Sequence, residues 1–161
     1  MAVRERTPST LDVSIDIAAP ADIVFDAFFQ DRALTAWLGT SRTIAVPRLL
    51  GPYVLEWRSE TGRDDAGPGD GVLRGSVMHV EPGIRLFAAD VYWLPLDAEP
   101  LGPLALEVTF APAAQSGGSR STLVRVVISG FDKDARWKQY HGSSTALWQR
   151  GLRGLKTLLE K

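Results

Sequence analysis

The sequence predicts an α+β fold in which a bent antiparallel β-sheet wraps around one long C-terminal helix. Three observations support this prediction. An alternating strand pattern near the start is followed by two short helical segments. Short apolar runs separated by Gly and Pro then fill the middle, which is typical of an antiparallel meander. A long helical pattern ends the sequence, so the expected order of elements is β-α-α-β6-α.

Residues 11–38 predict the first strand and both short helices. Apolar residues alternate with polar ones at Leu11, Val13, Ile15 and Ile17, as in a half-buried strand. Pro20 suits the first position of a helix over 20–29, because its missing N–H has no partner to lose there. Asp31 is predicted to cap a second short helix, and Gly39 is predicted to end it.

The middle of the chain predicts six further strands with Gly- and Pro-containing turns. The strands are expected near 42–47, 53–59, 71–80, 85–93, 104–111 and 121–129. Tight turns are expected at 50–52, 81–83 and 116–119. The longer connections 61–70 and 95–103 are rich in Gly, Pro and Asp, and we expect them on the surface.

The last helix is predicted over 135–160, with its apolar stripe centred on Trp148. The C-terminal half of the stripe, through Leu152, Leu155 and Leu159, has the composition of an ordinary core. The N-terminal half mixes Trp137 with His141, Ser144 and Thr145, which indicates something less than a dry core.

Composition limits the classes of function. The chain has 161 residues, of which 45% are hydrophobic and 23% charged, so we expect one globular domain over 11–161 after a flexible N-terminus at 1–10. The net charge of −1 argues against nucleic acid as a partner. With no Cys and only two His, neither a metal site nor another cofactor is expected. The sequence shows no membrane span and no secretory signal pattern, so we expect a cytoplasmic protein without a membrane partner.

Five local motifs occur in a consistent order along almost the whole chain. The first is residues 17–28 (Ile-Ala-Ala-Pro-Ala-Asp-Ile-Val-Phe-Asp-Ala-Phe). The others are Leu34-x-x-Trp37, Gly75-x-Val77 with Pro82 and Arg85-Leu86-Phe87, Ser129-Gly130-Phe131, and the closing run from Trp148 to Glu160. Together they resemble the START-like (SRPBCC) superfamily, and within it the bacterial homologues of the heat-shock protein 90 ATPase activator.

The resemblance implies the helix-grip (START-like, Bet v-like) fold, with a cavity between the sheet and the C-terminal helix. It says less about activity, because one fold serves many functions. In the eukaryotic activator a separate N-terminal domain carries much of the chaperone work. Only about ten residues precede the first predicted strand here, so the resemblance gives a chaperone partner little support.

The inward-facing positions of the strands and of the last helix predict the lining of this cavity. The candidate ligand-binding residues are Tyr53, Trp57, Val77, Phe87, Val91, Trp93, Leu106, Val108, Val126, Trp137, His141, Ser144 and Trp148. Each of them taken alone is more often an ordinary core residue. Four Trp converging on one volume are hard to pack without voids and carry polar edges, so we expect a small hydrophobic or aromatic ligand.

Two other functions remain open from the sequence. The first is a cyclase- or aromatase-like enzyme with His141 as proton shuttle; Tyr140 and Ser144 lie within a helical turn of it. The second is an interaction module for a chaperone ATPase or for a second copy in a homodimer, with Leu147 and Leu158 as surface candidates. A lone His on a helix face or a strand, such as His141 or His79, is more often structural than catalytic. No nucleophile elbow is present, and the Gly-rich segment 67–71 has the composition of a loop.

Overall fold

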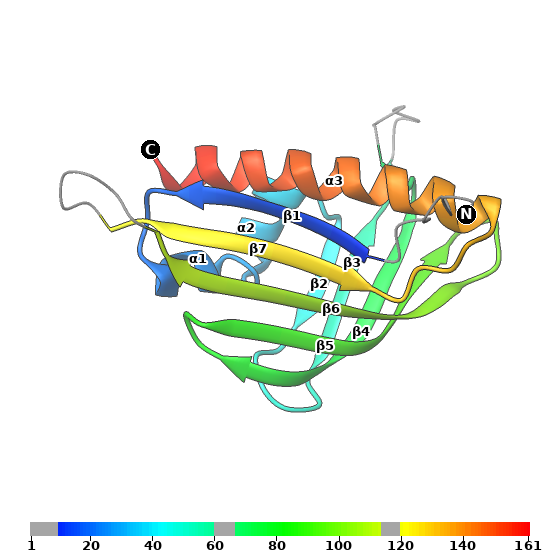
Figure 1. Ribbon diagram of the computed structural model, residues 1–161, viewed down its shortest axis with the longest axis horizontal. Helices are drawn as coiled ribbons and strands as arrows, with labels where there is room; N and C mark the ends of the chain where they lie inside the picture. The colour runs from blue at the N-terminus through cyan, green and yellow to red at the C-terminus, as the bar shows by residue number, and fades with distance from the viewer. Residues whose placement is uncertain (1–9, 60–66, 114–119) are drawn as a thin grey trace, which may run out of the picture.

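The computed structural model describes residues 10–59, 67–113 and 120–161, and these residues form a seven-stranded antiparallel sheet with three helices (Figure 1). In chain order the elements are β1 (Thr10–Ile17), α1 (Ala21–Asp26), α2 (Asp31–Leu38), β2 (Arg42–Ala45), β3 (Pro52–Trp57), β4 (Gly71–Glu81), β5 (Arg85–Pro95), β6 (Leu101–Pro112), β7 (Thr122–Ser129) and α3 (Ala135–Leu159). The expected fold class and order of elements are confirmed. The expected flexible N-terminus, apart from Thr10, most of the predicted connection 61–70 and the predicted turn 116–119 lie outside the described residues.

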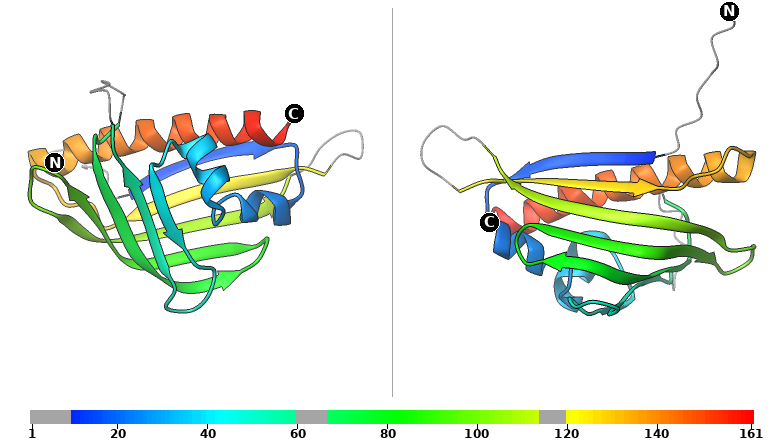
Figure 2. Two further views of the ribbon diagram at one scale, coloured as in Figure 1. Left: turned by 180° about the vertical axis from the view of Figure 1, so that it is seen from behind. Right: turned by 60° about the horizontal axis from the view of Figure 1, so that its bottom comes forward.

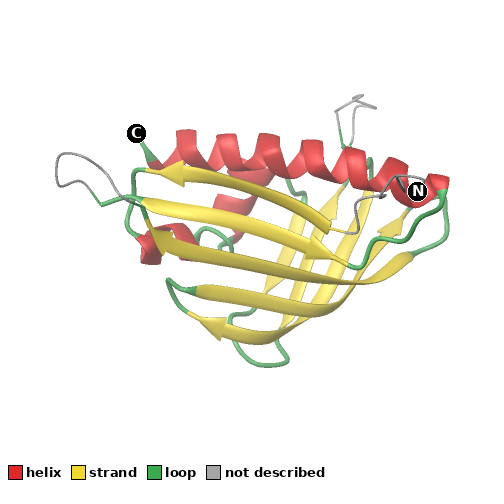
Figure 3. Ribbon diagram, viewed as in Figure 1, coloured by secondary structure: helices red, strands yellow, loops and turns green. Residues whose placement is uncertain are grey.

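The strands are arranged in the order β1-β7-β6-β5-β4-β3-β2, so the first strand pairs with the last one. The sheet is strongly curved, and the helices lie on its concave side (Figures 2 and 3). Helix α3 runs along the free edge of β1 and packs against α2. The interior therefore lies between the curved sheet and the three helices.

Irregular pairing bends β4 and β5. The register of β4 against β5 shifts between Arg74 and Ser76 and again between Val77 and His79. The register of β5 against β6 shifts between Ala88 and Val91, and Asp90 within this shift adopts φ 52°. An extra residue in a strand exchanges its inner and outer faces beyond that point. These bulges therefore decide which side chains reach the interior.

The ends of α1 and α2 differ from the predicted ones, and α3 carries a cap that was not predicted. α1 ends at Asp26, and Pro20 precedes the helix instead of opening it. The N-cap of α2 is Gln30, so the prediction for Asp31 is wrong: its carboxylate accepts a hydrogen bond from the hydroxyl of Thr43 on β2. α3 begins with a cap that the sequence analysis did not identify, because Asp134 accepts a hydrogen bond from the Trp137 main-chain N–H at 3.0 Å.

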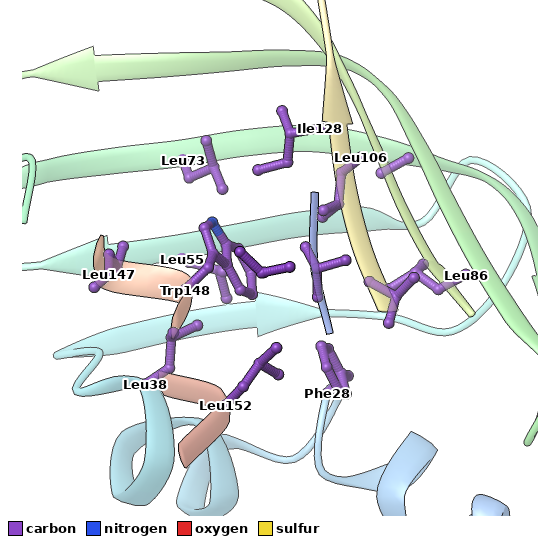
Figure 4. Packing of buried hydrophobic residues seen from close by; sticks show 14 of the residues in the cluster. Phe28, Leu38, Leu55, Leu73, Leu86, Leu106, Ile128, Leu147, Trp148 and Leu152 are labelled. Carbon is purple, nitrogen blue, oxygen red and sulfur yellow. The ribbon is translucent and has the colours of Figure 1, made fainter. Parts of the chain in front are cut away.

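Two glycines bring α3 close to α2. A Cβ added at Gly151 would lie 2.7 Å from Cδ1 of Leu38, and one added at Gly154 would lie 3.0 Å from the main-chain oxygen of Trp37. The close approach places Trp148 in the centre of the core, where it contacts side chains of both the sheet and the helices (Figure 4). The helix is therefore held over the interior from its C-terminal half.

Candidate functional site

The aromatic rings of the interior belong to or pack against one buried cluster, within which the ring–ring contacts fall into two groups. The first lies against α1 and α2 and contains Phe25, Phe28, Phe29, Trp37, Tyr53, Phe110 and Trp148. The second lies under the N-terminal half of α3 and contains Trp57, Trp93, Phe131, Trp137, Tyr140 and His141. No ring contact joins the two groups within the described residues. The four Trp expected in one volume all belong to or pack against one buried cluster, but Trp148 makes its ring contact in the first group and the other three make theirs in the second.

The first group is a packed core in which the polar atoms of Tyr53 and Trp37 are hydrogen-bonded. Phe28 and Phe110 meet edge to face with ring centroids 5.3 Å apart. The Tyr53 hydroxyl donates to the main-chain oxygen of Phe28 at 2.8 Å, and Trp37 Nε1 donates to that of Ala27 at 2.9 Å. Burial raises the pKa of Tyr53, so this hydroxyl stays protonated. These contacts anchor α1 and α2 to the sheet.

The second group connects β3 and β5 to α3. Trp93 lies 6.0 Å from Trp57 and stacks on Tyr140, with ring centroids 5.8 Å apart and an interplanar angle of 17°. Burial raises the pKa of Tyr140, and an interaction with the hydroxyl of Ser144, one helical turn along, acts in the opposite direction. Ser144 is itself buried at 1% exposure. Two hydroxyls thus lie among the rings at this end of the interior.

Three tryptophans with little exposed surface donate no hydrogen bond from their indole N–H in the described ranges. Trp37 and Trp57 each donate to a main-chain oxygen. Trp93, Trp137 and Trp148 are 3%, 8% and 1% exposed, and their indoles donate no hydrogen bond within the part of the chain that the structure describes. In Figure 4 the Trp148 nitrogen points towards the apolar side chains of Leu73 and Ile128. None of these three indole nitrogens is a fully buried atom without a partner, so each keeps some accessible surface.

The one fully buried side-chain polar atom without a partner in the described residues is the hydroxyl of Thr40, in the segment between α2 and β2. Thr40 is 2% exposed, and its Oγ1 has no hydrogen-bond partner. Sequence reasoning missed this residue, because a Thr beside a helix-ending Gly is an ordinary connection. The unpaired state of the indoles could not be read from the sequence either, since it depends on which carbonyl groups the folded chain places nearby.

Most of the predicted lining residues do lie inside. Tyr53, Val77, Val91, Trp93, Leu106, Val108, Val126, Trp137, Ser144 and Trp148 are buried, and Trp57 and His141 are half-buried. Phe87 is the exception: it lies on the outer face of the sheet, with the Arg85 guanidinium 5.4 Å from its ring centre. The bulge at Asp90 is the cause, because it places Leu86 and Ala88 inside instead of Phe87.

Both histidines make structural contacts. His141 Nε2 lies 2.8 Å from the main-chain oxygen of Thr10, so this nitrogen carries the proton and donates it. A nitrogen held in this way does not accept a proton from a substrate, which weakens the proton-shuttle role. His79 Nε2 lies 2.6 Å from a carboxylate oxygen of Glu81. Within the described residues no group of three or more His, Cys, Asp or Glu side chains could hold a metal ion.

The surface candidates on α3 also differ from expectation. Leu147 is buried at 7% exposure, and Leu158 packs partly buried against the core. The large apolar side chains that are exposed lie elsewhere, for example Leu49 and Leu50 between β2 and β3. No helix in the described ranges combines the length and apolar character needed to cross a lipid bilayer.

Comparison with known proteins adds the family. Three solved structures share the fold: a Chromobacterium violaceum protein (21% identity, 96% of this chain and 99% of that one, TM-score 0.68), an Aha1 dimer from Colwellia psychrerythraea (16%, 94% and 96%, 0.64) and an HSP90 activator from Plasmodium falciparum (12%, 95% and 97%, 0.63). None of the curated proteins matches significantly. The family model "Activator of Hsp90 ATPase homolog 1-like protein" matches residues 18–160. The expected relationship is confirmed, and the chain belongs to the Activator of Hsp90 ATPase homolog 1-like family.

Proposed function

We propose that this protein binds a small, mainly apolar or aromatic molecule that carries a hydrogen-bond acceptor, between the sheet and α3. The observation that supports it most is the unmatched indole N–H of Trp148, a side chain with 1% exposure. An acceptor on the ligand would give this donor a hydrogen-bond partner. The apolar surroundings would hold the rest of the ligand.

The other two candidate functions have less support in the geometry. The Nε2–H of His141 donates a hydrogen bond to a main-chain oxygen, so His141 is poorly placed as a proton shuttle. Two of the similar structures are described as an HSP90 activator and as an Aha1 dimer. However, Leu147 and Leu158, which the sequence suggested for such contacts, pack inward. Ligand binding is therefore the function that we carry forward.

The first experiment uses prodan, a neutral naphthalene fluorophore with one ketone oxygen. Transfer of prodan from water into the interior should shift its emission to the blue. Binding should also raise the melting temperature of the protein, because a ligand at 100 times its dissociation constant adds about 2.7 kcal/mol to the free energy of unfolding. If a saturating titration changes neither the emission nor the melting temperature, the proposal is wrong.

A variant pair tests the role of the donor. Trp148→Phe keeps an aromatic ring and removes the indole N–H, so we expect several-fold weaker prodan binding. Affinity for naphthalene, which has no acceptor, should change far less. Trp37→Phe is the matched control, because its indole already donates to Ala27. Trp37→Phe should lose stability but keep the preference for prodan over naphthalene. If both variants reduce this preference equally, the proposed contact with Trp148 is wrong.

A further inference from the structure

The free edge of β1 is tied to α3 by three side chains. The contacts join His141 Nε2 to the oxygen of Thr10, Lys156 Nζ to the oxygen of Asp16 and Glu160 Oε2 to the N–H of Ala18, each at 2.8 Å. All three main-chain groups belong to even-numbered residues. Main-chain groups alternate sides along a strand, so the even residues of β1 face α3 and the odd ones face β7.

Between these three contacts, the main-chain groups at the free edge of β1 have no partner on α3. By the same alternation, the main-chain N–H and C=O groups of Asp12 and Ser14 also face α3. No side chain of α3 bonds to them within the described residues. A cavity of about 280 Å³, open to solvent, lies at this place. It is lined by Val13, Ser14, Ile15, Gln149, Leu152 and Arg153.

Arg153 is the one charged residue among those that line this groove. Arg153 makes no ion pair, and the Gln149 amide makes no hydrogen bond, in the part of the chain that is described. Two of the neighbouring acids already have partners, and the third points away from the groove. Asp12 pairs with Arg125 on β7 at 2.5 Å, and Glu160 pairs with Lys156 at 2.6 Å, while Asp16 projects from the exposed outer side of β1. The Arg153 guanidinium is thus a cation without a counter-charge at the mouth of the cavity.

The groove also has an apolar floor. Val13 and Leu152 are buried at 7% and 1% exposure, and Ile15 packs against the core. The volume is close to the lower end of the range for small-molecule sites, which begins near about 300 Å³. A guanidinium, an amide and an unpaired main-chain N–H beside apolar side chains suit an anionic oxygen group with an attached hydrocarbon chain.

We propose that the groove between the edge of β1 and α3 binds a small aliphatic carboxylate. The carboxylate pairs with Arg153 and accepts hydrogen bonds from Gln149 and from the Ser14 N–H, and the hydrocarbon chain lies on Val13 and Leu152. The site is distinct from the aromatic interior, so it does not rest on the function proposed above. The two sites differ in charge as well, because the groove presents a free cation and the interior presents indoles.

The experiment titrates the intact protein with hexanoate and follows the N–H signals by NMR. We expect saturable shifts at Val13, Ser14 and Ile15, with the indole signals unmoved. Hexanamide, which lacks the charge, should bind at least tenfold more weakly than hexanoate. The Arg153→Gln substitution should weaken the binding of hexanoate by a similar factor. Arg150→Gln is the matched control: the Arg150 guanidinium lies near Gly67, away from β1, and affinity should not change.

The outcomes separate the two sites. Absence of saturable shifts at residues 13–15 overturns the groove proposal, and so does equal hexanoate affinity in the wild type and in Arg153→Gln. Hexanoate shifts confined to the indole signals would also overturn it, because they would place the acid in the interior. Arg153 is exposed, so its replacement should leave the melting temperature unchanged, and the two affinities can be compared directly.

Discussion

Leu50 and Asp90 are the two non-glycine residues with positive φ in the described ranges, at 65° and 52°. Asp tolerates this left-handed region because its short side chain bonds locally, whereas Leu has no such compensation. Leu50 is 70% exposed, so its side chain contributes little packing to offset the strain. It is held in place by its own N–H, which donates to the oxygen of Val77 at 2.6 Å. The strain is thus local to one residue of the loop between β2 and β3.

We predict that Leu50→Gly stabilises the protein by up to about 1 kcal/mol, because Gly adopts this conformation without steric cost. The measurement is the midpoint of urea unfolding at an unchanged m-value. Leu49→Gly is the matched control, since Leu49 is 62% exposed but does not have positive φ. It should be neutral or destabilising, and a similar gain in both variants would show that strain at Leu50 is not the cause.

Individual residues also show which parts of the candidate site cannot be predicted from the sequence. Trp93 and Val91 were placed inside from their alternation, and they are buried. Extending the same alternation from Val91 back to Phe87 gives the wrong face, because the bulge at Asp90 lies between these two residues. A bulge of this kind depends on the local pairing of β5 with β6, which a one-strand pattern does not contain. Whether a buried indole finds an acceptor is likewise decided by distant residues.

Helix α3 contains glycines in two different surroundings. A Cβ added at Gly142 meets nothing within 4 Å, whereas one at Gly154 would lie 3.0 Å from the main-chain oxygen of Trp37. Gly within a helix costs about 0.8–1 kcal/mol relative to Ala. At Gly154 the lost helix stability is therefore linked to the close approach of two helices. At Gly142 no packing contact in the structure requires a glycine.

We accordingly predict that Gly142→Ala raises the free energy of unfolding by about 0.5–1 kcal/mol. Gly154→Ala should gain less or lose stability, because its methyl group presses on the backbone of α2 and cannot be relieved by a side-chain rotation. Thermal and urea unfolding of both variants would measure the difference. Equal stabilisation of the two would mean that α2 and α3 pack less closely than the added-Cβ distances indicate.

Prediction of whole elements succeeded where a repeat extends over many residues. β1 and α3 were placed within one residue or so of their bounds, because their apolar residues recur at every second position or on one helical face. α1 was predicted too long, since Phe28 fits a helical spacing but lies beyond the end of the helix at Asp26. For Asp31 the capping rule was overridden by a tertiary contact, its hydrogen bond with Thr43. Short elements are decided by such contacts more than by propensity.

On the scale of the whole molecule, the two ends of the described chain are joined through carboxylates. Glu160 accepts hydrogen bonds from Lys156 at 2.6 Å and from the Ala18 N–H at 2.8 Å. The Lys156 bond, and then the Ala18 bond, hold the pKa of Glu160 below its ordinary value of 4.5. Arg125 likewise lowers the pKa of Asp12, which ties β1 to β7. The closing helix and the first strand are thus linked by groups that depend on pH.

A carboxyl with a lowered pKa in the folded state stabilises the fold above its unfolded pKa, and this contribution is lost as the pH falls through the folded value. At pH 7 we therefore predict a lower melting temperature for Glu160→Gln than for the wild type. The gap should narrow below about pH 4.5 and close once Glu160 is protonated in the folded protein. Asp97→Asn is the control, an exposed carboxylate without a partner in the described residues. Its melting temperature should follow the wild type at every pH, and a Glu160→Gln gap that stays constant down to pH 2 would show that the carboxylate charge is not what joins the closing helix to the first strand.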